Sequence, residues 1–220
     1  IYIQNYLSRF MMEESEETFG ESLRKALILK TQKSQDVYWN QFLSWFYVQQ
    51  KEYGKAFIQE KAIYKRNPES LNAIINLAQL AIDEKDDSTA TTILEFVLEN
   101  TTEIELLVQA NTYLMQVKID TTSEKDCPNL ETELSALISK YGISPFTLSL
   151  QLMQAHFLTF NLKKPEVGKT IVRAALELQL DEYETAKAKM ELADILLYEA
   201  KFNQALLYYS QIENDLKNDA

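Results

Sequence analysis

The fold is decided by the stretch FLSWFYVQQKEYGKAFIQEKAIYKRNPES, residues 42–70. It reads as a helix up to Gln50, a turn of two residues, and a second helix over 53–65. Asn67-Pro68 ends the second helix, because proline lacks a backbone amide and disfavours helix in the residue before it. The stretch therefore predicts a helical hairpin over residues 37–70.

Four side chains of this hairpin fall where two packed helices meet: Leu43, Tyr47, Tyr53 and Ala56. Ala56 is small where the helices cross closely, and Tyr53 opens the second helix and packs back on the first. One such pair cannot bury its apolar face alone, so neighbouring pairs must stack into a continuous core.

A second stretch, ELADILLYEAKFNQALLYYSQI at residues 191–212, repeats the pattern near the end of the chain. The segments between the two match less closely. The helix pair over 103–141 is interrupted by the polar stretch 120–129, and Pro165 opens the second helix of the pair over 145–180. We expect six helix pairs, at approximately 2–35, 37–70, 71–102, 103–141, 145–180 and 182–217.

Both stretches resemble the tetratricopeptide repeat (TPR), a unit of about 34 residues. Ser44 stands at the small position of the first helix, and Asn40 replaces the usual tryptophan. The resemblance implies an all-α, right-handed superhelical solenoid of antiparallel helix pairs, in a single array over residues 1–220. Similar arrays occur in bacterial proteins, often in the cell envelope. By that analogy the location is the envelope or periplasm, with the cytoplasm as the alternative.

Composition agrees with a packed helical protein and excludes some partners. Of the 220 residues, 46% are hydrophobic and 25% charged, and Gly and Pro number four each, which favours helices joined by short turns. The formal net charge of −11 repels nucleic acid and anionic membranes. No apolar run reaches the length of about 18 residues that a membrane span needs. Because the chain opens with Ile1, we expect it to be part of a longer protein.

The sequence offers few groups for catalysis. His156 is the only histidine and has no metal-ligating residue at a suitable spacing, while Cys127 is the only cysteine and precedes Pro128 in the expected polar loop. Acidic clusters at 13–17 and 83–87 read as solvated turns, since neither has the spacing of a calcium loop. Glycine-rich phosphate loops and nucleophile elbows are missing. We therefore predict no enzyme activity, no cofactor and no metal.

The helix over 37–50 is apolar nearly all round, so one of its faces is either buried against other helices or open to a partner. In TPR arrays the first helix of each pair lines the concave surface. By resemblance, the groove residues would be Tyr38, Gln41, Phe42, Trp45 and Gln49, with Asn72, Ile75, Asn76 and Gln79 from the next repeat. The alternative is that these rings pack on neighbouring first helices or on a flanking domain.

The predicted function is that of a protein–protein interaction scaffold, which holds a peptide or a partner helix in this groove. A clamp for acidic peptide C-termini is not expected, because only Asn76 suits such a clamp and its cationic members are missing. Two alternatives stay open. The chain could be an accessory or docking domain of a larger enzyme or envelope assembly, or a helical protein that binds a small ligand or glycan.

Overall fold

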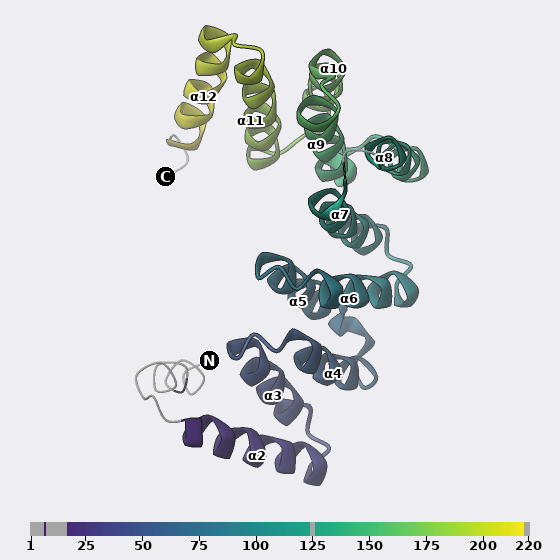
Figure 1. The fold of residues 1–220 in the computed structure, drawn as a ribbon, viewed down its shortest axis with the longest axis vertical. Coiled ribbons are helices and arrows are strands. Elements are labelled where there is room, and N and C mark those ends of the chain that lie inside the picture. The colour runs from purple at the N-terminus through teal and green to yellow at the C-terminus, as the bar shows by residue number, and fades with distance from the viewer. Residues whose placement is uncertain (1–6, 8–16, 124–125, 218–220) are drawn as a thin grey trace. The chain divides into compact units, whose positions relative to one another are not determined.

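The computed structural model describes residues 7, 17–123 and 126–217. Within these residues every regular element is helical (Figure 1). The contacts divide the chain into two compact units, Ile1–Thr101 and Thr102–Ala220. Apart from Leu7, the helix expected over residues 2–12 lies outside the described residues.

The described residues of the first unit, from Glu17 onward, form five helices, and each packs against the next along the chain. A single 3₁₀ turn, Pro68–Ser70, joins the third to the fourth. The helices are α2 (Glu17–Lys33), α3 (Val37–Gln49), α4 (Tyr53–Tyr64), α5 (Leu71–Asp83) and α6 (Asp87–Asn100).

The second unit follows the same plan, with a 3₁₀ turn at Pro145–Thr147 and a π-helical turn at Phe157–Asn161. Its helices are α7 (Ile104–Thr121), α8 (Cys127–Tyr141), α9 (Leu148–His156), α10 (Pro165–Leu176), α11 (Glu182–Tyr198) and α12 (Phe202–Lys217). Here too, consecutive helices pack on one another. The predicted fold class, an all-α array of helix pairs, is confirmed.

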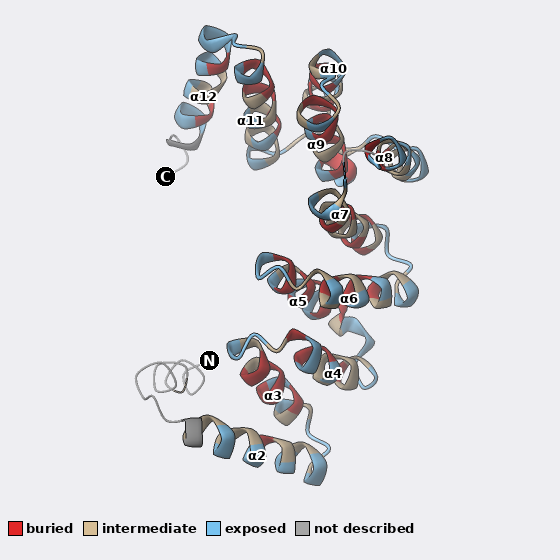
Figure 2. Ribbon diagram, in the orientation of Figure 1, coloured by how far each residue is buried: buried red, intermediate tan, exposed pale blue. Residues whose placement is uncertain are grey.

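The seam between the helices of a pair is built as the sequence predicts. Leu43, Tyr47, Tyr53 and Ala56 are all buried, and the buried positions lie where helices face one another (Figure 2). Asn40, which replaces the usual tryptophan, is also buried. Its carboxamide donates to Gln59 Oε1 at 3.0 Å and accepts from the Arg66 guanidinium at 2.9 Å. These bonds tie α3 to α4 and to the residues that follow it.

A small residue occupies the fourth position of the second helix in most pairs. It is Ala56 in α4, Ala90 in α6, Gly168 in α10 and Ala205 in α12, and all four are buried. In α8 the equivalent position holds Leu130, which packs in a local cluster with Val108 and Leu134. The small residues let the two helix backbones approach closely.

The turns inside four pairs are short because one residue adopts a left-handed backbone conformation. These residues are Lys51, Lys85, Lys163 and Ala200, with φ between 55° and 63°. Glycine is the usual choice there. Inside these four pairs lysine or alanine takes that place, whereas a glycine, Gly142 with φ 80°, follows the end of α8.

The break between α7 and α8 is shorter than the polar stretch 120–129 predicted, because both ends of that stretch are helical. Helix α7 continues to Thr121, whose hydroxyl donates to the Val117 carbonyl, and α8 begins at Cys127. The Cys127 side chain is buried in the core of this pair rather than exposed in a loop. Pro128 is compatible with the first turn of α8, because the first amides of a helix have no intrahelical partner.

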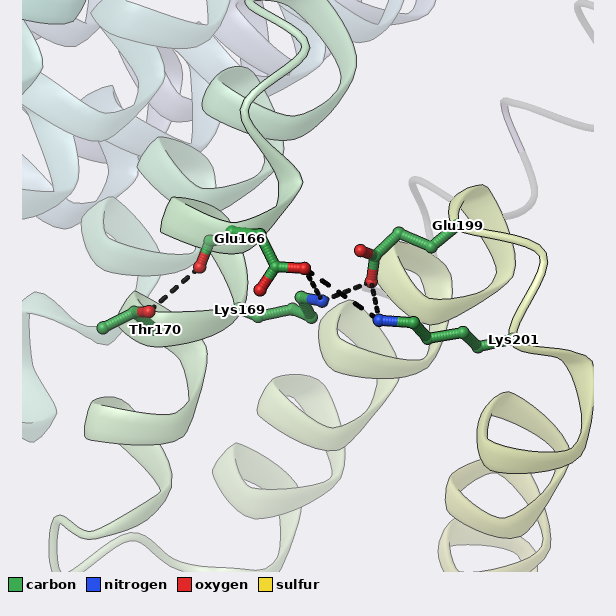
Figure 3. A network of polar contacts seen from close by, with 5 residues as sticks. All are labelled: Glu166, Lys169, Thr170, Glu199 and Lys201. Carbon is green, nitrogen blue, oxygen red and sulfur yellow. Dashed lines mark hydrogen bonds and ion pairs between the residues drawn. The ribbon is translucent and has the colours of Figure 1, made fainter.

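A buried lysine joins the fifth pair to the sixth (Figure 3). The Lys169 side chain on α10 is 3% exposed, and its ammonium lies 2.7 Å from Glu166 and 2.5 Å from Glu199 at the end of α11. Lys201 also reaches Glu199, at 3.1 Å. Burial alone would lower the pKa of Lys169, but the hydrogen bonds to Glu166 and Glu199 outweigh it and raise that pKa. The lysine therefore stays charged and its pairing holds the two pairs together.

Gly168 should be intolerant of any side chain. A β-carbon there would lie 2.3 Å from Thr159 Oγ1 and 2.8 Å from the Ala155 carbonyl oxygen. Overpacking of this kind costs about 1–3 kcal/mol, so we expect Gly168→Ala to lower the free energy of unfolding by about 2 kcal/mol or more in urea denaturation.

Gly54 supplies the matched control, because its β-carbon would meet only Thr89 Oγ1, at 3.9 Å. Gly54→Ala should leave the free energy of unfolding unchanged or raise it by up to about 1 kcal/mol. Equal effects of the two substitutions would show that α10 does not approach α9 as closely as described.

Candidate functional site

A groove of about 350 Å³ lies between α3 and α5 in the first unit. Each helix contributes four residues with the spacing i, i+3, i+4, i+7, which places them on one helix face. They are Gln41, Ser44, Trp45 and Val48 from α3, and Ala73, Asn76, Leu77 and Leu80 from α5. Glu60 and Ile63 of α4, with Ser70, complete the lining.

The groove combines apolar surface with carboxamides. Trp45 is half-buried, and Leu80 is 42% exposed although it is a large apolar side chain. Gln41 and Asn76 are exposed on the two helices that form the walls. Apolar area flanked by uncharged hydrogen-bonding groups is the composition expected of a surface that holds a polypeptide.

Glu60 is the one charged residue among the eleven that line the groove. Its carboxylate accepts a hydrogen bond from the Ser44 hydroxyl at 2.5 Å. Burial raises the pKa of Glu60, while the bond from Ser44 acts in the opposite direction. The ionised carboxylate is therefore less favourable here than in water.

Of the nine predicted groove residues, three line the groove, four lie outside its lining and two are buried. Gln41, Trp45 and Asn76 line the groove. Tyr38, Gln49 and Asn72 are exposed on the same two helices but outside its lining, and Gln79 donates to the Asp83 carboxylate at 2.8 Å.

Phe42 and Ile75 require a correction, because they are only 7% and 1% exposed. The Phe42 ring packs between its neighbours, with its centroid 5.9 Å from that of Tyr38 and 5.3 Å from that of Trp45. Neither side chain is open to a partner.

The discrepancy has a simple geometric origin. On α5 the predicted face was 72, 75, 76 and 79, whereas the groove uses 73, 76, 77 and 80. A shift of one residue turns the face by about 100°. Leu80 could have indicated the correct face of α5. It is an apolar residue seven positions after Ala73, and it lies on a face that does not take part in the seam. Glu60 was missed because it belongs to a second helix.

His156 has a partner that sequence spacing could not reveal. Its Nδ1 lies 3.2 Å from the Glu191 carboxylate, which comes from α11, and its ring packs 4.4 Å from that of Phe160. The hydrogen bond with Glu191 raises the pKa of His156 above its ordinary value, although burial opposes it. The pair belongs to the second unit, and the groove residues belong to the first.

The other candidate groups have structural surroundings. The Cys127 thiol faces the Ser123 carbonyl at 3.7 Å. In the acidic cluster 83–87, Glu84 pairs with Lys51 and Asp86 caps α6 by accepting from the Thr89 amide. Of the cluster 13–17, all but Glu17 falls outside the described residues. The described residues contain no group of three or more His, Cys, Asp or Glu that could hold a metal ion.

The helix-pair architecture matches a solved structure. The crystal structure of a thermophilic TPR protein from Thermus thermophilus superposes on this chain with a TM-score of 0.55, covering 84% of this chain and 93% of that one at 16% identity. The fold is that of a TPR protein. The sequence itself matches no family model and no curated protein. At this identity the TPR likeness concerns the fold alone. Among the described helices, none has the length and apolarity needed to cross a membrane.

The His156–Glu191 contact should be visible in titrations. We expect the His156 imidazole, followed by NMR, to titrate above 6.5, and Glu191→Gln to bring its pKa back towards that value. A histidine with a raised folded pKa stabilises the fold fully below the unfolded value and loses that effect as pH rises through the folded one. Glu191→Gln should therefore destabilise more at pH 5.5 than at pH 9. An unchanged His156 titration in the variant would contradict the contact.

Proposed function

We propose that this chain is a non-catalytic scaffold that binds an extended segment or a helix of a partner protein in the groove between α3 and α5. The observation that carries the proposal is the accessible apolar surface of Trp45 and Leu80 inside a formed groove. Water in contact with this surface would be released on binding, which favours association by about 25 cal/mol per Å² of apolar area buried.

The polar groups of the groove suit a polypeptide. A bound segment brings backbone amides and carbonyls that must be hydrogen-bonded once they leave water. The carboxamides of Gln41 and Asn76 each offer both donors and an acceptor, and they come from opposite walls. This arrangement supports recognition of a main chain, with the apolar lining taking the side chains.

The non-catalytic part of the proposal rests on the same lining. The groove holds neither histidine nor cysteine, and Glu60 is its only acid. Acid–base and nucleophilic mechanisms need at least two cooperating groups within hydrogen-bond reach. The Ser44 hydroxyl does bond to Glu60, but this hydroxyl is buried and no third group in the lining orients the pair, which supports binding rather than turnover.

The test separates binding from folding. Peptides of 12 residues are selected from a random phage-displayed library on the immobilised chain, and their affinities are measured for two variants. Trp45→Ala should weaken binding by about 2 kcal/mol or more, as for a central interface aromatic. It should lower the free energy of unfolding by less than about 1.5 kcal/mol, because Trp45 is only half-buried.

Leu43→Ala is the control, since Leu43 lies on the same helix but is 2% exposed in the seam. It should cost about 2–5 kcal/mol of stability, with affinity per folded molecule retained. A large stability loss for Trp45→Ala without a separate binding defect would mean that the indole is a core residue and that the groove is not the binding surface.

A further inference from the structure

We propose that the partner segment carries a basic residue, lysine or arginine, and that the Glu60 carboxylate pairs with it inside the groove between α3 and α5. The inference rests on the proposed function and names the class of partner for that same groove.

The first support is the isolation of Glu60. No ion pair to its carboxylate is formed within the described residues, and the carboxylate accepts a hydrogen bond from the neutral Ser44 hydroxyl. Ser44 is itself buried. A partly buried carboxylate without a cation has lost solvation that nothing charged replaces. A cation that enters the groove would supply what is missing.

The second support is the rest of the lining. The groove contains no lysine or arginine, so an acidic partner would meet repulsion from Glu60 and find no counter-charge. Trp45 offers an aromatic ring in the same groove, and indole is the best side-chain partner for a cation. Leu80, which is 42% exposed, would accept an apolar residue next to the basic one.

The third support is long-range charge. The chain carries a formal net charge of −11. A field of this sign attracts basic segments and speeds their encounter, while it slows acidic ones. The local charge of the groove and the charge of the whole chain thus select the same class of partner.

The experiment repeats the phage selection on four forms of the chain: the natural one, Glu60→Gln, Trp45→Ala and Glu95→Gln. Glu95 is an exposed acid on α6 that does not line the groove, so it controls for the loss of one negative charge. We expect the natural chain and Glu95→Gln to enrich peptides with lysine or arginine at one fixed position between apolar residues. Glu60→Gln should still enrich apolar peptides, but without the basic preference.

The pairing is then measured directly. The best peptide, synthesised and titrated at about 50 mM salt to limit screening, should bind Glu60→Gln at least about tenfold more weakly than the natural chain, a difference of about 1.4 kcal/mol. Replacing the peptide's basic residue by glutamine should weaken binding to the natural chain similarly. The same replacement should have little further effect on Glu60→Gln, as expected for a direct pair.

The outcomes distinguish this inference from the proposed function. If the natural chain enriches no peptide, or Trp45→Ala enriches the same ones, the proposed groove function fails and the inference fails with it. If the natural chain enriches peptides without a basic preference, or the preference survives in Glu60→Gln, the inference is overturned while the groove function stands. Urea unfolding of Glu60→Gln verifies that its fold is retained.

Discussion

The close packing of the two helices within each pair is the constraint on which the rest of this structure depends. A small buried residue at the fourth position of the second helix, such as Ala56 or Ala205, lets the backbones approach and buries large residues like Leu43 on the facing helix. The seam fixes the rotation of each first helix about its own axis. Once the seam residues of a first helix are fixed, the residues on its other faces are fixed as well.

The groove is a consequence of that rotation. With Leu43 and Tyr47 committed to the seam of α3, the residues Gln41, Ser44, Trp45 and Val48 face the matching set on α5. The short left-handed turns hold consecutive helices in register without glycine, and Asn40 braces α3 against the residues that follow α4. Folding thus places an exposed leucine, a tryptophan and one carboxylate together, and their chemistry supports recognition of a basic, otherwise apolar segment.

The sequence predicted what is local and periodic, and missed what is distant. Helix pairs, seam residues and proline stops follow from spacings within a single repeat. The burial of Cys127 could not be predicted from such spacings. Its polar neighbours are typical of a loop, whereas α8 begins at Cys127 and the thiol packs in the core. Glu191 meets His156 from 35 residues away, and Glu60 reaches the groove from the opposite helix of its pair. The predicted groove face on α5 was displaced by one residue. Sequence periodicity does not resolve a shift of this size, but the shift was enough to include the buried Ile75 and to omit Leu80.

The most direct test of the central claim is an NMR map of where a selected peptide binds. Backbone amide and Trp45 indole signals of the labelled chain are followed as the peptide is added. We expect the largest shift changes on the lining residues of α3 and α5, together with Glu60 and Ile63 of α4. Saturable changes concentrated on α6 or in the second unit, with the Trp45 indole unmoved, would contradict it.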